Sequence, residues 1–355
     1  MKLAIDAADS AMRRNMKGRR NADAFFRRWE IDRAGLEAMV LRGLPSSVSA
    51  YYVSSIPRGL GGSTSDIDLL LITDDAAEQE TSVSRMLFFA GRRVGAKVLV
   101  RAEIAASFAL VEADLAAWDR NQVFPSGRLP IKWMDLERVV NGTSFDHDPE
   151  YADQLPTLSA WATLLFFEAA AGNAHLHLLA AQASQPGAAY AYGQATLMAA
   201  MDCIMASRGD FQYNMKWILE RWRRFCADGP STANRSLVEA LTEARKRLEC
   251  TPGDPSGSAT ALSALIGALR AEVLGAQPEP PTLALGAEVT VNNFLPGASV
   301  LQTDGRAVVV RHEILDNLLQ VGPSQGMMSQ ALAAAALTLL QGGYLRILQG
   351  GPRHD

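Results

Sequence analysis

Cysteine is scarce in this sequence and has no regular spacing. The 355 residues include three cysteines, Cys203, Cys226 and Cys250, which lie far apart and are odd in number. A structural zinc site needs closely spaced Cys or His pairs, and a disulfide framework needs an even number of cysteines. The sequence therefore predicts neither kind of site.

An excess of charge of either sign is also lacking. Lys and Arg total 34 and Asp and Glu total 38, which gives a formal net charge of −4. Such a chain has no overall basic field that would draw it to nucleic acid or anionic lipid. The late segment GMMSQALAAAALTLLQ contains no Lys or Arg, whereas a DNA-reading helix carries basic residues. The composition favours a small-molecule or protein partner over nucleic acid.

Long apolar runs are missing as well. The first twenty residues contain neither the apolar core nor the small-residue cleavage site of a secretory signal. The most apolar late segment, residues 331–340, is too short to cross a bilayer. We therefore expect a cytoplasmic protein with no membrane partner.

The first third of the chain has the pattern of an α/β (α+β) domain with a short mixed sheet. Apolar residues recur at helical intervals over residues 23–42, and residues 77–92 also suit a helix. Residues 49–56 and 66–73 are rich in strand-forming residues, with a Gly/Ser-rich loop between them. Apolar and polar residues alternate over residues 93–104, which is typical of a half-buried strand.

The rest of the chain divides at two proline-rich stretches. Residues 125–156 have the composition of a connector, and the stretch 277–282 has that of a linker. Between them, Ala, Leu, Met and aromatic residues predict an α-helical bundle. Beyond the linker, short strand-like and helical pieces predict a small winged-helix-like module. The expected domains are residues 1–125, 126–276 and 283–355.

The segment from Ser54 to Asp68 carries the most chemical information. Asp66 and Asp68 occupy alternate positions of a predicted strand, so their carboxylates share one face and can share divalent cations. The Gly/Ser-rich loop before them offers backbone N–H groups and hydroxyls to an anion. Phosphate on one side and metal-binding carboxylates on the other is the arrangement that nucleotidyl transfer requires.

This segment resembles the polymerase-β-like nucleotidyltransferases, whose small-molecule-modifying members carry G-S-x-x-x-G, five residues, then S-D-x-D. Ser55, Gly59, Ser65, Asp66 and Asp68 match the pattern in identity and spacing. The resemblance implies that Ser55 contacts the terminal phosphates of a nucleoside triphosphate and that Asp66 and Asp68 hold Mg²⁺. The other residues of this segment expected to bind nucleotide are Ser54, Arg58, Gly61, Gly62, Ser63 and Ser65.

Two positions depart from the family pattern. Ser54 stands where the family has glycine, and its side chain could crowd the approach of a phosphate. The third carboxylate, which the family usually places on a nearby strand, has no clear counterpart among residues 93–101. Glu103, late on the polar face of that expected strand, and Glu168, in the apolar run WATLLFFEAAAG, are the two candidates for the catalytic base.

A second segment, RGDFQYNMKWIL, resembles a helical part of some of these enzymes. By that resemblance, Tyr213 and Lys216 would face the triphosphate across the cleft. The alternative is that the apolar residues of this segment form core and that Lys216 is solvated.

The sequence thus predicts a Mg²⁺-dependent nucleotidyltransferase. An acceptor hydroxyl, amine or carboxylate would attack the α-phosphorus, and pyrophosphate would leave. ATP is the default donor by cellular abundance, and the acceptor is expected to be a small molecule or a peptide. The C-terminal module would bind a protein partner or form a dimer contact. The alternatives are a nucleotide-binding or scaffold protein that has lost the chemistry, and a regulator that acts through the C-terminal module.

Overall fold

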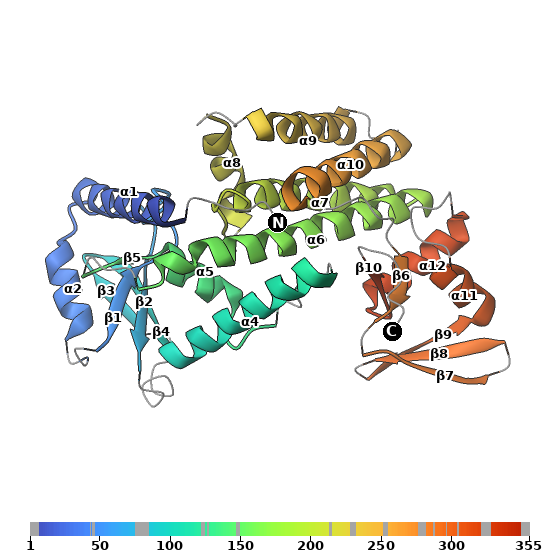
Figure 1. The fold of residues 1–355 in the computed structure, drawn as a ribbon, viewed down its shortest axis with the longest axis horizontal. Coiled ribbons are helices and arrows are strands. Elements are labelled where there is room, and N and C mark those ends of the chain that lie inside the picture. Colours follow the sequence, from blue (N-terminus) through green and yellow to red (C-terminus); the bar gives the residue numbers. More distant parts are fainter. Residues whose placement is uncertain are drawn as a thin grey trace. The chain divides into compact units, whose positions relative to one another are not determined.

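The protein divides into two compact units in the computed structural model (Figure 1). Unit 1 comprises Met1–Thr163 and Met205–Arg221, and unit 2 comprises Leu164–Ile204 and Trp222–Asp355. The three domains expected from the sequence stay a prediction beside this division. The structure describes residues 7–42, 44, 47–74, 85–121, 125, 128–146, 150–212, 215–227, 232–250, 255–275, 282–286, 288–295, 297–303, 305–320 and 328–348.

Unit 1 is built on a five-stranded mixed sheet, so its fold is α+β. The strand order is β3-β4-β2-β1-β5. The central strands β2 and β4 are parallel, and every other neighbouring pair is antiparallel. The strands are β1 (Ser49–Tyr52), β2 (Ile67–Thr73), β3 (Arg85–Phe89), β4 (Arg92–Val100) and β5 (Thr143–Ser144).

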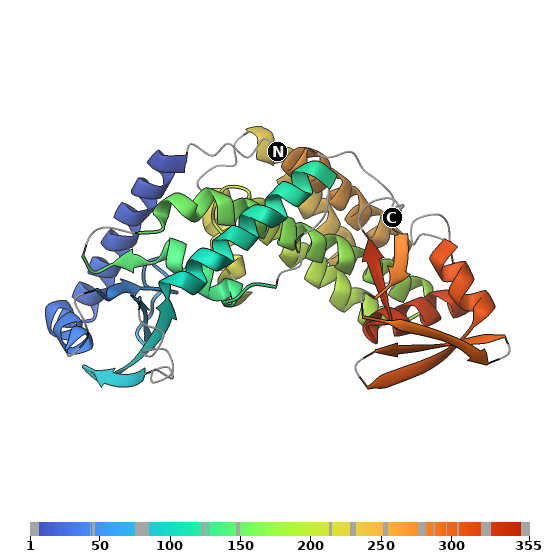
Figure 2. The same cartoon turned by 60° about the horizontal axis from the view of Figure 1, so that its bottom comes forward.

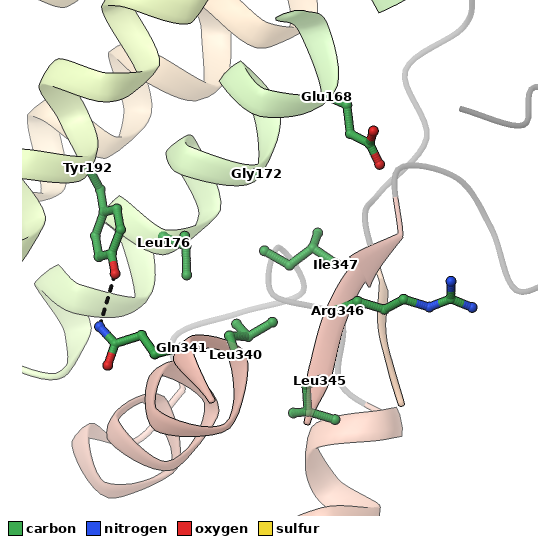
Figure 3. Close-up of a pocket in the computed structure, with 9 residues that line it drawn as sticks. All are labelled: Glu168, Gly172, Leu176, Tyr192, Leu340, Gln341, Leu345, Arg346 and Ile347. Carbon is green, nitrogen blue, oxygen red and sulfur yellow. Dashed lines mark hydrogen bonds between the residues drawn. The ribbon is translucent and has the colours of Figure 1, made fainter. Parts of the chain in front are cut away.

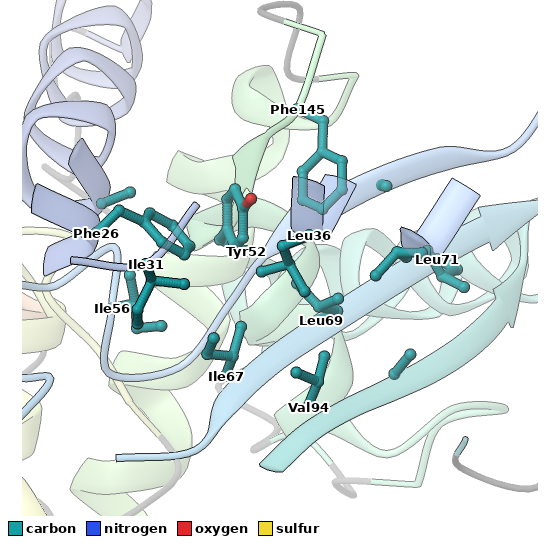
Figure 4. Close-up of a cluster of buried hydrophobic side chains, with 14 of the residues drawn as sticks. Phe26, Ile31, Leu36, Tyr52, Ile56, Ile67, Leu69, Leu71, Val94 and Phe145 are labelled. Carbon is teal, nitrogen blue, oxygen red and sulfur yellow. The ribbon is translucent and has the colours of Figure 1, made fainter. Parts of the chain in front are cut away.

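Helices cover both faces of this sheet (Figures 1 and 2). On one face α1 (Ala7–Arg28) and α2 (Arg33–Leu41) enclose a hydrophobic core, the α1–α2 core (Figure 4). That core takes alternate residues of the central strands, Ile67, Leu69 and Leu71 from β2 and Val94, Ala96 and Val98 from β4. The residues between them, including Asp68 and Lys97, therefore face the other side. There α5 (Trp133–Asn141) packs, with an ion pair of 2.5 Å between Asp135 and Lys97.

Unit 2 combines long helices with a C-terminal module of strands and helices. Helices α6 (Leu155–Gln182), α7 (Pro186–Ala206) and α8 (Ile218–Ala227) begin or end in unit 1. Helices α9 (Thr232–Cys250) and α10 (Pro255–Leu269) lie wholly in unit 2, and α10 continues into a π-helical turn, Arg270–Leu274. Two helical stretches among the described residues, Ala152–Gln182 and Gly257–Leu274, are long and apolar enough to span a membrane; buried core helices pass the same test.

The C-terminal module contains a three-stranded meander and a two-stranded sheet. Its core includes Leu283, Leu301, Leu315 and Leu339 and packs on Leu179 of α6. The winged-helix topology expected from the sequence is not shown by the described residues. The elements are β6 (Thr282–Leu285), β7 (Thr290–Leu295), β8 (Ala298–Thr303), β9 (Arg306–Arg311), α11 (His312–Gln320), α12 (Gln330–Gln341) and β10 (Leu345–Leu348), and β10 pairs with β6.

Several secondary-structure expectations in unit 1 are wrong. The described part of the expected helix 77–92 is strand β3 and a tight turn, in which Ala90 and Gly91 both have positive φ, 48° and 75°. Two such residues form the kind of turn that joins antiparallel strands, here β3 and β4. The expected strand 93–104 ends at Val100, and α4 (Arg101–Asn121) begins at the next residue. Glu103 therefore lies in the first turn of a helix.

Three further short elements were missed by the sequence patterns. The expected connector 125–156 contains α5 and the edge strand β5. Strand β8 lies between Gly297 and Gly305, which have φ of 70° and 74° and form the turns on either side of it. All three are short elements whose apolar residues become a recognisable face only when the neighbouring element is in place.

Candidate functional site

Asp68 is the second residue of β2, on the sheet face opposite the α1–α2 core, and Asp66 lies directly before the strand. Asp66 is exposed and Asp68 is partly buried. The backbone carbonyl of Asp68 accepts a 3.0 Å hydrogen bond from the Val53 amide, which holds the end of β1 beside β2. Strand geometry places Asp68 on this face, and the Asp66 carboxylate lies 3.9 Å from Arg93, which presents its side chain on the same face.

Positive charges surround the two carboxylates. Burial raises the pKa of the Asp68 carboxyl above its usual value, and the charges of Arg138 and Arg93 and a hydrogen bond from the Ser54 hydroxyl oppose that rise. The Arg93 guanidinium lies 3.9 Å from the Asp66 carboxylate, with both side chains about half exposed. The site therefore combines two acids with two arginines, and a phosphate-bearing ligand would meet cations beside the carboxylates.

The loop between β1 and β2 is a compact turn. Ser54 has φ of 62° and Gly59 has φ of 66°, so the backbone at Ser54 adopts the left-handed conformation that glycine favours. The Leu60 amide donates to the Ser55 carbonyl at 2.9 Å, and the Gly62 amide donates to the Ser65 hydroxyl at 2.8 Å. Ser54 therefore retains a glycine-like backbone at the position where the nucleotidyltransferase pattern has glycine.

Two contacts with α1 explain the shape of the loop. A Cβ on Gly61 would lie 2.9 Å from the Phe25 ring, so the close packing of the loop on α1 requires glycine there. Asn21 of α1 donates to the Pro57 carbonyl at 2.8 Å. Ser63, expected to contact phosphate, is exposed at the outer part of the loop.

Arg58 lies within a cluster of carboxylates. Its guanidinium donates to Glu137 at 2.5 Å, to Asp210 at 2.9 Å and to the Phe211 carbonyl at 2.5 Å, and its side chain is 13% exposed. Arg221 pairs with the same Asp210 at 3.3 Å. Arg58 thereby ties the loop to α5 and to the segment Met205–Arg221. Its expected contact with nucleotide stays a prediction.

Helix α5 contributes acids that the sequence patterns did not single out. Asp135 and Glu137 are almost fully buried, and Arg138 pairs with Asp135 at 3.4 Å. The signal was available in part, because the run Asp135–Arg138 places three charged residues in a short segment between apolar ones. Their burial depends on partners from β4 and from the loop, Lys97 and Arg58, which no local pattern identifies.

The strand beside Asp68 carries no acid at the facing position. In the parallel register Asp68 pairs with Gly95, so the same face of β4 presents Arg93, Gly95 and Lys97. A Cβ on Gly95 would lie 3.7 Å from the Asp68 carboxylate, an ordinary contact distance. Among the residues that the structure describes, no three His, Cys, Asp or Glu side chains are grouped to hold a metal ion.

The remaining predicted residues are dispersed. Thr73 and Val100 pair at the far end of the strands, roughly 16 Å from Asp68 by strand rise, and Glu103 lies beyond them, so Glu103 is not brought to the two aspartates. Glu168 lies in unit 2. Lys216, in the short helix Met215–Trp217 of unit 1, is exposed with its ammonium 5.0 Å from the centre of the Trp217 ring. Tyr213 lies outside the described residues.

Exposed apolar side chains adjoin the carboxylates on the edge strand β3. Met86 pairs with Gly95 and Phe88 pairs with Arg93, so both share the face that carries Asp68. Their exposed fractions are 49% and 70%, while Leu87, between them, packs on the α1–α2 core. With no side chain on Gly95, Met86 is the next side chain beyond Asp68, roughly 10 Å away across two strand spacings.

Comparisons with known proteins give a family but no activity. One similar solved structure is the crystal structure of a nucleotidyltransferase-like protein from Exiguobacterium sibiricum, whose sequence is 14% identical to this one. The superposition covers 67% of this chain and 75% of that chain, with a TM-score of 0.35. A likeness this low supports no argument about function. No curated protein matches the chain. The family profile that matches residues 10–349 is described as a family of unknown function, DUF6001, and the chain belongs to that family.

Proposed function

We propose that unit 1 binds a nucleoside triphosphate through a divalent cation held by Asp66 and Asp68, and that it transfers the nucleoside monophosphate to an acceptor. The observation that carries the proposal is the pair of carboxylates on one sheet face, directly after a Gly/Ser loop whose turn is closed by its own backbone hydrogen bonds. The motif G-S-x-x-x-G…S-D-x-D supplies the resemblance to nucleotidyltransferases.

The carboxylate oxygens of Asp66 and Asp68 are ligands that suit Mg²⁺. This ion takes oxygen ligands and is commonly bound by one or two carboxylates together with substrate phosphates. Burial of Asp68 disfavours its charged form, and a bound cation would offset that cost. Mg²⁺ bound there would neutralise phosphate charge and polarise the phosphorus that is attacked.

Different side chains of unit 1 would bind different parts of the substrates. Ser55 and the Gly61–Ser63 loop, beside β1, would hold the terminal phosphates, and Arg93 and Arg138 would add positive charge next to the carboxylates. In-line displacement places the acceptor opposite the leaving pyrophosphate. That direction is toward β4 and β3, where Gly95 leaves space and Met86 and Phe88 are exposed. We infer a small-molecule or peptide acceptor with an apolar group, and ATP as the default donor.

Calorimetric titration of ATP, GTP, CTP and UTP with Mg²⁺ tests the binding step. One nucleotide is expected to bind only with Mg²⁺, and Asp66→Asn/Asp68→Asn is expected to abolish that binding. Glu112→Gln, an exposed acid on α4, is the matched control and should bind as the wild type does. The proposal would be contradicted if the wild type bound nucleotide equally well with and without Mg²⁺. It would also be contradicted if the double variant bound nucleotide as tightly as the wild type.

A second candidate is a nucleotide-binding protein without transfer activity. It is favoured by the β4 face, where Arg93 and Gly95 occupy positions that could carry a third carboxylate. Pyrophosphate release separates the two functions. Wild-type release in the presence of an apolar amine or alcohol acceptor supports transfer. Nucleotide binding without release, together with tighter Mg²⁺ binding by Gly95→Asp than by Gly95→Asn, supports the second candidate.

A further inference from the structure

Unit 2 contains a pocket of about 330 Å³ that the proposed chemistry of unit 1 does not use (Figure 3). Helices α6 and α7 form one wall, and α12 and β10 of the C-terminal module form the other. All four elements belong to the same unit. Pockets that bind small molecules start at about this size.

The interior of the pocket is apolar. Leu176 of α6, Leu340 of α12 and Ile347 of β10 converge in Figure 3. The polar groups at one side bond to each other, because Gln341 donates to the Tyr192 hydroxyl at 2.9 Å. That hydrogen bond links α12 to α7.

Glu168 is the one carboxylate among the residues that line the pocket. Glu168 is partly buried, and within the described residues its carboxylate makes no hydrogen bond or ion pair. Burial raises the pKa of Glu168, and the charge of Arg346 opposes the rise. Arg346 also lines the pocket, but it is exposed and its guanidinium points away from Leu176, Leu340 and Ile347 (Figure 3). A carboxylate in apolar surroundings is costly unless a cation or donor pairs with it.

We propose that this pocket binds a small primary amine with an apolar body. The ammonium group would pair with Glu168, and the hydrocarbon part would pack among Leu176, Leu340 and Ile347. An anionic ligand would meet the negative charge of Glu168, whereas the guanidinium of Arg346 points away from the apolar side chains. A neutral alcohol of the same length would gain the apolar contacts but not the ion pair. This binding is independent of any activity in unit 1.

The test is a calorimetric titration of the full chain with octylamine, octanol and octanoate, each below its aggregation concentration. Octylamine is expected to bind at least about tenfold more tightly than octanol, because a hydrogen-bonded charge pair adds to the same apolar contacts. Glu168→Gln should reduce the affinity for octylamine to that for octanol and leave octanol binding in place, which also shows that the variant is folded.

A steric variant locates the site independently. A Cβ on Gly172, which lines the pocket, meets no atom within 4 Å, so Gly172→Leu should place its side chain in the pocket and abolish binding of octylamine and octanol. Gly267→Leu is the matched control, because Gly267 has the same open surroundings on α10, outside the pocket. Equal octylamine affinity in wild type and Glu168→Gln, octanoate binding as tight as octylamine, or no binding by the wild type would overturn the proposal.

Discussion

At the scale of single residues, Ser54 shows how this chain accommodates a departure from the nucleotidyltransferase pattern. Its φ of 62° lies where a Cβ is strained by about 1 kcal/mol, and its hydroxyl compensates in part by a hydrogen bond to Asp68. Ser54→Gly relieves the strain but loses the bond, whereas Ser54→Ala loses the bond and keeps the strain. We expect Ser54→Gly to exceed Ser54→Ala in free energy of unfolding by about 1 kcal/mol, measured by urea denaturation.

A serine within a regular helix is the control for this expected order of stability, in which the glycine variant is more stable than the alanine variant. At Ser236, exposed on α9, alanine should be more stable than glycine by about 1 kcal/mol because glycine weakens a helix interior. An alanine at position 54 as stable as the glycine would show that the backbone there is not left-handed.

At the scale of elements, Arg58 connects three segments of unit 1 that are far apart in sequence. Glu137 on α5 and Asp210 both pair with its guanidinium, and the Glu137 side chain is 5% exposed. Removing one partner of a buried ion pair leaves the other charge uncompensated, which costs about 3–5 kcal/mol. We expect Arg58→Ala to lower the free energy of unfolding of unit 1 by that amount, measured by urea denaturation.

An exposed arginine on α1 is the matched control for Arg58. Arg27→Ala should change stability by less than about 0.5 kcal/mol, because that side chain is solvated. Stability near that of the wild type together with lost nucleotide affinity in Arg58→Ala would instead assign Arg58 to phosphate binding, as the family resemblance implies.

At the scale of the whole molecule, two histidines are expected to make stability depend on pH. Unit 2 contains His175 and His177 on α6, and burial lowers the pKa of both, to about 4 for His175. A lowered folded-state pKa means that the unfolded chain binds more protons below about pH 6.5, so this contribution to stability is complete above that pH. It is lost as the pH falls toward 4, by at most about 1.4 kcal/mol per pH unit for each histidine.

Urea denaturation at about pH 7 and about pH 4.5 measures this dependence. Glu168 acts in the opposite direction, because its raised pKa favours the folded state on acidification. The two proteins to compare are therefore the wild type and His175→Gln/His177→Gln, by the free energy of unfolding that each loses between the two pH values. We expect the double variant to lose less stability than the wild type between the two pH values, and an equal loss would contradict the prediction.

The sequence by itself determined the features that are local. The composition and length of residues 66–73 predict a strand, and the structure has β2 at Ile67–Thr73, with Asp68 inside it and Asp66 directly before it. The periodic apolar residues of 23–42 likewise specify helix, apart from the break at Trp29–Asp32 between α1 and α2. Helices α6 and α7 follow from their Ala- and Leu-rich composition.

Only the tertiary structure decided which residues meet. Strand β3 forms because a turn at Ala90–Gly91 lets it pair with β4, and that pairing outweighs the helical pattern of the segment. Arg58, Glu137 and Asp210 come together across 79 and 152 residues, and Glu168 joins a pocket with residues of the last helix and strand. A sequence pattern records the preferences of neighbouring residues, whereas contacts at such separations depend on how the sheet and helices pack.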